Sequence, residues 1–417
     1  MNSTNIKVVK HMKQDLNFYI KEKTSQFWKA TIALSFGSFL VFSNLHFTQP
    51  LLPLISREFE VSPAMASLTV SLVTLSLSLF LLLVGPFSDH IGRKNLMSFG
   101  LLSSSLFSLA IFFVTDFWFL LFLRTLQGVT LACLPAIAYA YIAEEFEKKA
   151  IGVAIGLYIS GNTIGGMGGR IIGGFTSDLW GWRYAYLTMG LIGIFCFLLF
   201  VFYLPKSKHF SPNSLELKEV LGHLIIHLKN HELRSAYYIA GIIFFIFMGL
   251  FNYLSYHLHG APYHLSSSII GLLFLSYLAG TFSSTLSGKL DAVMSIPIRM
   301  CAGFLIMLVG VLLTLFSSLL MILIGLIIVC FGFFFVHAAA TNWVSILAKE
   351  AKGSASSLYL FFYYAGGSLG SYVLGFVWEY FGWYAIVTVT ILLLLVGLKI
   401  TLGMVAVQKK EKLKMTM

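Results

Sequence analysis

The chain has 417 residues, of which 58% are hydrophobic and only 11% are charged. Soluble domains average about 25% charged residues, so this composition excludes an ordinary water-soluble fold. A net charge of +11 would suggest a nucleic-acid ligand in a soluble protein. Here the positive charges lie in short loops between apolar runs, which indicates orientation in a bilayer and no nucleic-acid partner.

Twelve apolar spans follow a polar, lysine-rich N-terminal segment. About 20 apolar residues cross the hydrocarbon core as a helix, which satisfies its own backbone groups. The first span is too long for the apolar region of a cleavable signal peptide, so we expect it to be retained. The spans cover residues 30–55, 64–86, 95–114, 117–142, 151–175, 184–204, 236–256, 268–288, 298–316, 318–342, 353–377 and 384–406.

The loop charges support this number of helices. When the N-terminus is placed inside and the loops alternate, nearly all Lys and Arg residues outside the spans fall on the inner side. Only Arg57 and Arg183 fall on the outer side. A wrong helix count would mix the two sets, so we expect a multi-pass protein of the cytoplasmic membrane with both termini in the cytoplasm.

The longest polar interruption separates the first six spans from the last six. Apolar residues recur in it at helical spacing among charged ones, which predicts an amphipathic helix at the cytoplasmic surface. We therefore expect an N-terminal amphipathic segment, a six-helix bundle, a central loop, a second six-helix bundle and a cytoplasmic tail. Their bounds are 1–28, 29–204, 205–235, 236–406 and 407–417.

The two halves are related by an internal repeat. Residues 152–182 align without a gap with residues 353–383, and Asp178 then aligns with Glu379. Leu-Tyr and Gly-Trp pairs match at fixed distances from shared glycines, which similar composition alone does not explain. Two similar bundles can rock around a central site and expose it to each side in turn. The sequence thus predicts an all-α membrane protein with two pseudo-symmetric bundles.

The loop between spans 2 and 3 contains a glycine-rich charged motif, formed by Gly85, Asp89, Gly92, Arg93 and Lys94. Gly85 allows close approach of a neighbouring helix, and Gly92 permits a tight turn. Asp89 can face a helix N-terminus or a cation, and Arg93 can pair with an acid.

This segment resembles the signature of the major facilitator superfamily, and the resemblance implies the twelve-helix fold and a latch between its two halves. The alternative is a simple positively charged loop anchor. The counterpart in the second half, from Gly288 to Asp291, is degenerate.

Span 4 contains a charged residue inside the membrane, Arg124, with Gln127 and Gly128 following it. An intramembrane arginine is costly and usually faces the bundle interior or water. The segment resembles a second motif of the superfamily, and the resemblance implies a role for Arg124 and Gln127 in proton or substrate coupling. The alternative is an arginine that snorkels to the outer surface.

Span 5 presents glycines four residues apart, which form a smooth ridge for close helix contact. The ridge consists of Gly161, Gly165, Gly169 and Gly173, with Gly366 and Gly370 in the second half. It resembles the helix-5 motif of drug:proton antiporters but has Gly166 where that motif usually has proline. Packing alone would also explain the glycines.

Arg170 lies on an adjoining stripe of span 5. We expect it to reach the central cavity and to hold an anionic substrate or an internal carboxylate; the alternative is a snorkelling residue. Span 1 offers Asn44, His46 and Gln49 as a polar face, and His46 titrates near neutral pH. For His46, a buried hydrogen-bonded histidine is the competing interpretation.

No acidic residue lies in the middle of a span, although proton antiporters of the superfamily commonly use one. Coupling would then use His46, an acid at a helix end such as Asp178 or Glu379, or the charge of the substrate, and facilitated diffusion stays open. His223 and His227 lack a third ligand, so we expect no metal site. No cofactor is expected.

The resemblance covers nearly the whole chain and is closest to the drug:proton antiporter-like branch of bacterial inner-membrane efflux proteins. It implies a secondary active transporter that exports a small, partly apolar, neutral or anionic molecule by alternating access with proton coupling. The alternative is an importer or facilitator of an organic anion or nutrient. We find no catalytic dyad or metal cluster in the sequence, so we expect no enzyme activity. We expect a monomer in the lipid bilayer, with a small-molecule substrate and protons as its partners.

Overall fold

The computed structural model describes residues 19–207 and 217–416. Residues 1–18, most of the expected N-terminal amphipathic segment, lie outside the described part. The described chain is helical, and its one isolated bridge joins Ile20 to Phe146. The helices of the first half are α2 (Ser25–His46), η1 (Gln49–Leu51), α3 (Leu52–Glu58), α4 (Pro63–Ile91), α5 (Arg93–Ile111), α6 (Phe117–Leu131), α7 (Cys133–Glu145), α8 (Lys148–Trp180) and α9 (Trp182–Tyr203).

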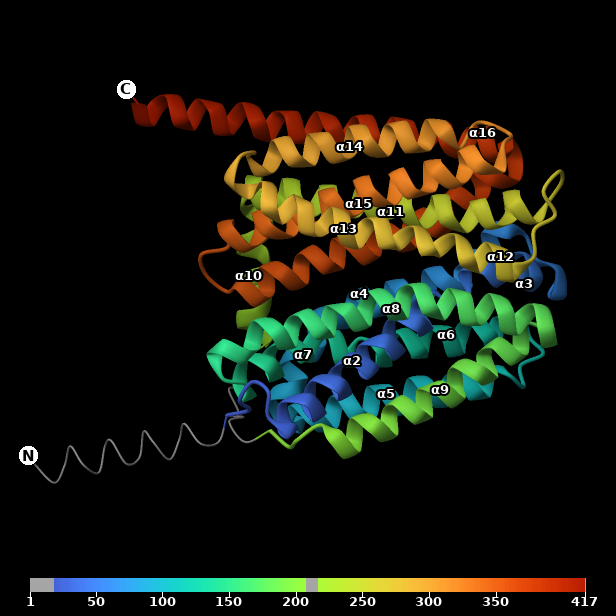
Figure 1. The fold of residues 1–417 in the computed structure, drawn as a ribbon, viewed down its shortest axis with the longest axis horizontal. Coiled ribbons are helices and arrows are strands. Elements are labelled where there is room, and N and C mark those ends of the chain that lie inside the picture. Colours follow the sequence, from blue (N-terminus) through green and yellow to red (C-terminus); the bar gives the residue numbers. More distant parts are fainter. Residues whose placement is uncertain (1–18, 208–216, 417) are drawn as a thin grey trace, which may run out of the picture.

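The second half repeats this arrangement after a short connecting helix. Figure 1 shows α2–α9 gathered on one side and α11–α16 on the other, with α10 at one end of the molecule. The elements are α10 (Leu217–Lys229), α11 (His231–His259), α12 (Ser267–Leu272), η2 (Leu273–Ser276), α13 (Tyr277–Lys289), η3 (Leu290–Ala292), α14 (Ile296–Leu313), α15 (Leu319–Leu347) and α16 (Lys352–Thr416).

The predicted spans all correspond to helices. Within the described residues, ten helical stretches are long and apolar enough to cross a membrane by length and composition. The stretch 352–410 contains two predicted spans. They are separated at Gly382, whose backbone leaves the helical region with φ 69°. The less apolar helix α5 corresponds to the third predicted span.

Two helix limits differ from those expected. Helix α2 begins four residues before position 29, because the Thr24 side chain accepts a hydrogen bond from the Phe27 N–H and caps the helix there. Helix α16 continues to Thr416, beyond position 406. Its last turns contain Lys, Glu and Gln, which favour helix.

Two tight reversals occupy equivalent places in the halves. Gly181 separates α8 from α9 with φ 95°, and Gly382 divides α16 with φ 69°. Glycine takes this left-handed backbone without the steric cost of a side chain. The internal repeat therefore extends to the backbone conformation at the turn after the fifth and eleventh helices.

Glycines bring pairs of helices into backbone contact. A methyl group added at Gly165 or Gly169 would fall against the α2 backbone at Phe39 or Ser43. Gly161 and Gly173 face α2 in the same way. In the second half, Gly366 and Gly370 face the backbone of α11 at Gly241 and Phe245. Side chains at these positions would force the helices apart.

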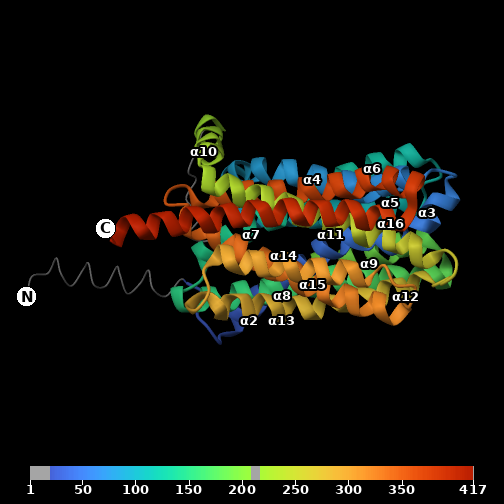
Figure 2. The ribbon, with the colours of Figure 1, turned by 90° about the horizontal axis from the view of Figure 1, so that it is seen from above.

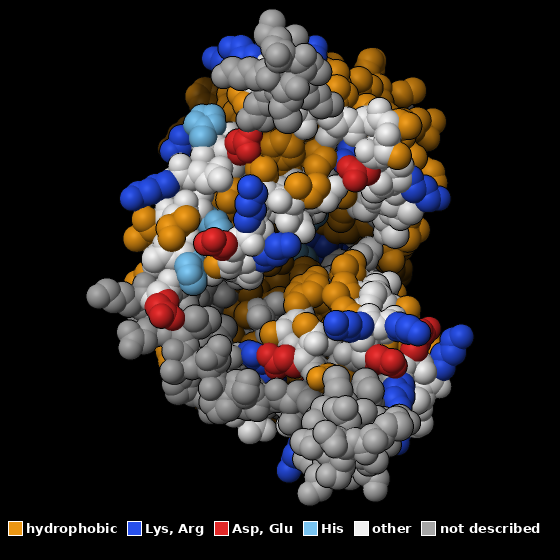
Figure 3. Space-filling view, turned by 90° about the vertical axis from the view of Figure 1, so that its left-hand side faces the viewer, with side chains coloured by type: hydrophobic (Ala, Val, Ile, Leu, Met, Phe, Trp, Pro, Cys, Tyr) orange, Lys and Arg blue, Asp and Glu red, His pale blue; other side chains and the backbone are white. Residues whose placement is uncertain are grey.

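The halves approach each other at the end of the molecule opposite α10. Helix α4 packs along the first part of α16, and α8 packs on α12. Figure 2 shows α10 and the end of α16 together at one end, with α3 and α12 at the other. Figure 3, which faces the α10 end, shows that this end is hollowed between the halves. The structure is therefore closed at the end opposite α10.

Candidate transport site

Arg124 lies on α6 inside the first half, with none of its surface exposed. Its Nε donates to the Thr69 carbonyl at 2.8 Å, and its Nη1 donates to the Asn44 carbonyl at 3.1 Å and to the Gln127 side-chain oxygen. Its Nη2 is buried without a partner. The Phe47 ring lies 5.8 Å from its guanidinium carbon. The guanidinium thus points into the bundle and does not reach the surface.

Gln127 joins this arginine to α2 and α5. Its Nε2 donates to Ser108 Oγ at 2.7 Å, to the Ser104 carbonyl at 2.9 Å and to Asn44 Oδ1 at 3.1 Å. Asn44, Arg124 and Gln127, which the sequence singled out separately, therefore form one buried polar cluster. We call it the Arg124 cluster.

Arg170 lies on α8 at the boundary between the halves and is also fully buried. Its Nε donates to Gln49 Oε1 at 2.5 Å, and its Nη1 donates to the Gly166 carbonyl at 2.5 Å. Its guanidinium carbon lies 4.3 Å from the ring centre of Phe274 and 5.0 Å from that of Tyr277, both in the second half. Such cation–π contacts are favourable when desolvated.

Gln49 extends this contact into a polar seam between the halves, made of Arg170, Gln49, Asn252 and Ser371. Gln49 Nε2 donates to Asn252 Oδ1 at 2.6 Å, and Asn252 Nδ2 donates to Ser371 Oγ. Asn252 lies on α11 and Ser371 on α16. The prediction from sequence missed both, although Asn252 stands in an apolar span as Asn44 does and could have been found by the same criterion.

His46 makes no hydrogen bond through Nδ1, although it is only 6% exposed. Its ring lies 6.5 Å from that of Phe244 in the other half. His46 therefore lies at the boundary between the halves. The role of His46 stays a prediction.

The second half faces this boundary with packed rings, which we call the aromatic cluster. Phe244 stacks on Tyr363 with ring centres 3.8 Å apart, and Phe247 stacks on Phe333 at 4.0 Å. The His337 ring lies 4.8 Å from that of Tyr363, and Tyr359 Oη is 2.9 Å from His337 Nδ1. The cluster consists of Phe244, Phe247, Phe333, His337, Tyr359 and Tyr363.

Two carboxylates join the halves at the closed end. Asp178 accepts from the N–H groups of Ser267 and Ser268 at 3.1 and 2.7 Å, at the start of α12. Glu379 accepts from the N–H of Ala64 at 2.7 Å, in the first turn of α4. A helix start carries partial positive charge and unpaired N–H groups, so both contacts are favourable.

The charged motif after α4 forms contacts within the first half. Gly92 ends α4 with φ 92°. Arg93 makes a two-pronged ion pair with Glu144, with Nε–Oε2 3.0 Å and Nη2–Oε1 2.5 Å. Lys94 donates to the carbonyls of Val201 and Leu204 at the end of α9. The surroundings of Gly85 and the side chain of Asp89 lie outside the described part.

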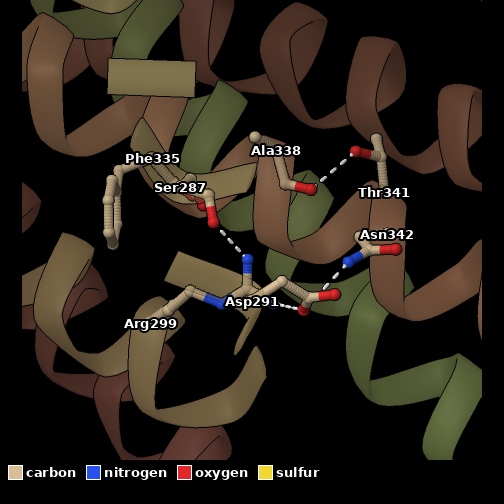
Figure 4. Close-up of polar contacts among 7 residues, drawn as sticks. All are labelled: Ser287, Asp291, Arg299, Phe335, Ala338, Thr341 and Asn342. Atoms are coloured by element: carbon tan, nitrogen blue, oxygen red, sulfur yellow. Dashed lines mark hydrogen bonds and ion pairs between the residues drawn. The ribbon is translucent and has the colours of Figure 1, made fainter. Parts of the chain in front are cut away.

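The second half has a comparable charged cluster, shown in Figure 4. Arg299 of α14 pairs with Asp291 and donates to the Ser287 carbonyl. Asn342 of α15 lies 3.4 Å from the same carboxylate. The motif that looked degenerate in sequence is completed by an arginine from the next helix. A search at the motif's own spacing misses this residue, because Arg299 lies eight residues after Asp291 whereas Arg93 lies four residues after Asp89.

The described residues contain no group of three or more His, Cys, Asp and Glu side chains that could hold a metal ion. His227 Nε2 instead lies 3.3 Å from the Ala351 carbonyl. The polar groups gathered at the boundary between the halves suit the binding of a small molecule rather than of a metal.

Comparison with known proteins identifies the family. The profile described as Major Facilitator Superfamily matches residues 34–371. The chain is 39% identical to the uncharacterized MFS-type transporter YybF of Bacillus subtilis, covering 91% of this chain and 94% of the relative. It is also 39% identical to the inner membrane transport protein YnfM of Escherichia coli, covering 92% of each. A solved bacterial homologue of the human lysosomal transporter Spinster, in an inward-facing unoccupied conformation, shares the fold with a TM-score of 0.76. That match has 17% identity and covers 91% of this chain and 97% of the other. The chain therefore belongs to the major facilitator superfamily and is a multi-pass membrane transporter of the secondary type, not an enzyme.

Proposed function

We propose that this transporter exports a small, partly apolar molecule by alternating access, coupled to protons. The observation that carries the proposal is the arrangement of the halves. Asp178 and Glu379 bridge the closed end, and the α10 end is hollowed. We place the α10 end in the cytoplasm, in agreement with the loop charges. The structure then corresponds to a state that accepts substrate from inside.

Protonation of the two bridging carboxylates would weaken their contacts with the helix starts. Protons that enter from the outside would then favour opening of that end, and their release inside would favour closing. The proposed coupling groups are these acids, His46 and the Arg124 cluster. The charged motif around Gly85, Asp89, Gly92, Arg93 and Lys94 would act as a latch in the alternate state.

A more distant relative supports the direction of transport. The multi-drug resistance efflux pump PmrA of Streptococcus pneumoniae is 31% identical over 195 residues, 45% of this chain. The alternative is uptake or facilitated diffusion of an organic anion. It is favoured by Arg124 and Arg170, two buried arginines that pair with no carboxylate among the described residues. Deletion of the gene separates the two: increased drug sensitivity indicates export, and loss of growth on a nutrient indicates uptake.

The test is flux of a mixed panel of drugs and metabolites in proteoliposomes, with and without a proton gradient. Wild type is compared with Arg124→Ala, at equal reconstituted amounts. We expect flux to collapse when an ionophore removes the gradient, and also in the variant. Flux that does not depend on the proton gradient would contradict proton coupling and indicate a facilitator or an exchanger.

A further inference from the structure

The boundary between the halves is chemically asymmetric. The first half contributes cationic and polar groups: Arg170, Gln49 and His46. The second half contributes the aromatic cluster and, beside it, Tyr277. The Tyr277 ring lies 5.0 Å from the Arg170 guanidinium carbon and 5.4 Å from the Phe247 ring. A continuous series of buried contacts thus runs from a guanidinium to stacked rings.

Among the described residues, no carboxylate pairs with Arg170 at this boundary. Its partners are the neutral oxygens of Gln49 and Gly166 and the faces of two rings. The ion pairs that join two described residues lie elsewhere, at Arg93, Arg183 and Arg299. Burial of a charge is costly unless an opposite charge compensates it. An intramembrane charge of this kind is a candidate site for an anionic ligand.

Two side chains beside Arg170 could respond to such a ligand. Gln49 Oε1 occupies the position on Arg170 Nε that an anionic oxygen would take. His46 has a buried ring nitrogen without a partner, and its ring faces Phe244 of the aromatic cluster. An incoming anion can displace Gln49 from Arg170. His46 offers an additional donor.

We propose that this boundary is the binding site of a small aromatic carboxylate or a similar amphipathic anion. Arg170 and Gln49 hold its carboxylate, and the aromatic cluster stacks on its apolar body. The proposal rests on the transport function proposed above and specifies its substrate class. A bidentate guanidinium–carboxylate contact is strong and directional, and ring stacking is favoured by offset or edge contacts.

The test is equilibrium binding of 2-naphthoate, with 2-naphthamide as a neutral probe of the same shape, to purified full-length protein in detergent. We expect the carboxylate to bind at least about 10-fold more tightly than the amide, as for hydrogen bonds to charged groups. In Arg170→Gln this preference should disappear. Arg183→Gln, which changes a half-buried arginine paired with Glu58 at the closed end, should leave it intact.

Gln49→Glu provides a second variant in case Arg170→Gln does not fold. It places an internal carboxylate on Arg170, so the protein should stay folded but lose at least about 10-fold in naphthoate affinity. Phe247→Leu should weaken both probes equally, by about 2- to 10-fold, because it removes stacking and leaves the charge contact.

The proposal is overturned if the amide binds as tightly as the carboxylate. It is also overturned if Gln49→Glu leaves the affinity for 2-naphthoate unchanged. A third contrary result is that neither 2-naphthoate nor the smaller aromatic carboxylate benzoate binds with a Kd below about 1 mM. Flux in proteoliposomes separates this result from the transport function. Anion binding without flux supports the site and contradicts the transport proposal. Flux of neutral molecules without a preference for anions contradicts the proposed site and supports the transport proposal.

Discussion

Asp178 and Glu379 occupy equivalent positions in the two halves, and each caps the start of a helix in the opposite half. Asp178 accepts from two N–H groups of α12, and Glu379 accepts from one of α4. The closed end is thus held by a pseudo-symmetric pair of contacts between carboxylates and helix starts. Such caps depend on charge and short distance, so they break when the halves separate.

Removal of these charges should open the closed end. The negative charge of a carboxylate at a helix start contributes about 0.3–1 kcal/mol, so Asp178→Asn or Glu379→Gln should shift the equilibrium by about 2- to 5-fold. The distance between spin labels at Thr115 and Tyr380, exposed residues of opposite halves, measures this shift. Glu58→Gln removes a charge at the same end within one half and should leave the distance distribution unchanged. A double variant that remains as closed as wild type would contradict the role of the caps.

Acidification should have the same effect in the wild type. Protonated carboxyl groups accept hydrogen bonds more weakly and lose the attraction to the helix start. The label distance should therefore lengthen as the pH falls. In the Asp178→Asn and Glu379→Gln double variant the distance should be long at every pH. If acidification acts equally in both proteins, another group controls this end.

The equivalence of Asp178 and Glu379 is visible in the aligned repeat, but their partners are not. Each carboxylate meets a helix start from the other half, and only the packing of α8 on α12 and of α16 on α4 brings them together. The twelve spans, in contrast, could be predicted because lipid requires long apolar helices. The breaks at η1 and η2 inside two spans were missed.

The polar residues within spans could be predicted in part. Intramembrane charge singled out Arg124 and Arg170 because charge is rare there. Asn252 and Ser371 complete the polar seam, but a serine in a helix is too common to indicate a site. The sequence did not indicate Arg299 because this residue lies on α14, outside the motif that it completes. Tertiary packing, rather than local pattern, decides these contacts.

The glycine ridge permits a matched comparison of two adjacent faces of α8. In Gly165→Ala the new methyl group would press on the Phe39 backbone, whereas in Gly168→Ala its nearest neighbour is a ring carbon at 3.5 Å, an ordinary contact. We expect Gly165→Ala to cost about 1–3 kcal/mol of stability through overpacking. Gly168→Ala should be neutral or slightly stabilising. Thermal unfolding in detergent measures both, and equal stability of the two variants would contradict close packing at the ridge.

Arg93 offers a test of the proposed latch. Its guanidinium binds both oxygens of Glu144, a geometry that lysine cannot reproduce. We expect Arg93→Gln to reduce flux in proteoliposomes by at least about 5-fold, as expected for loss of a charged hydrogen bond, and Arg93→Lys to give an intermediate value. Lys149→Gln, which changes an exposed cation in the first turn of α8, should transport as wild type. Normal transport by Arg93→Gln would contradict the latch. If Arg93→Lys transports as wild type while Arg93→Gln does not, the residue serves only to anchor positive charge on one side of the membrane.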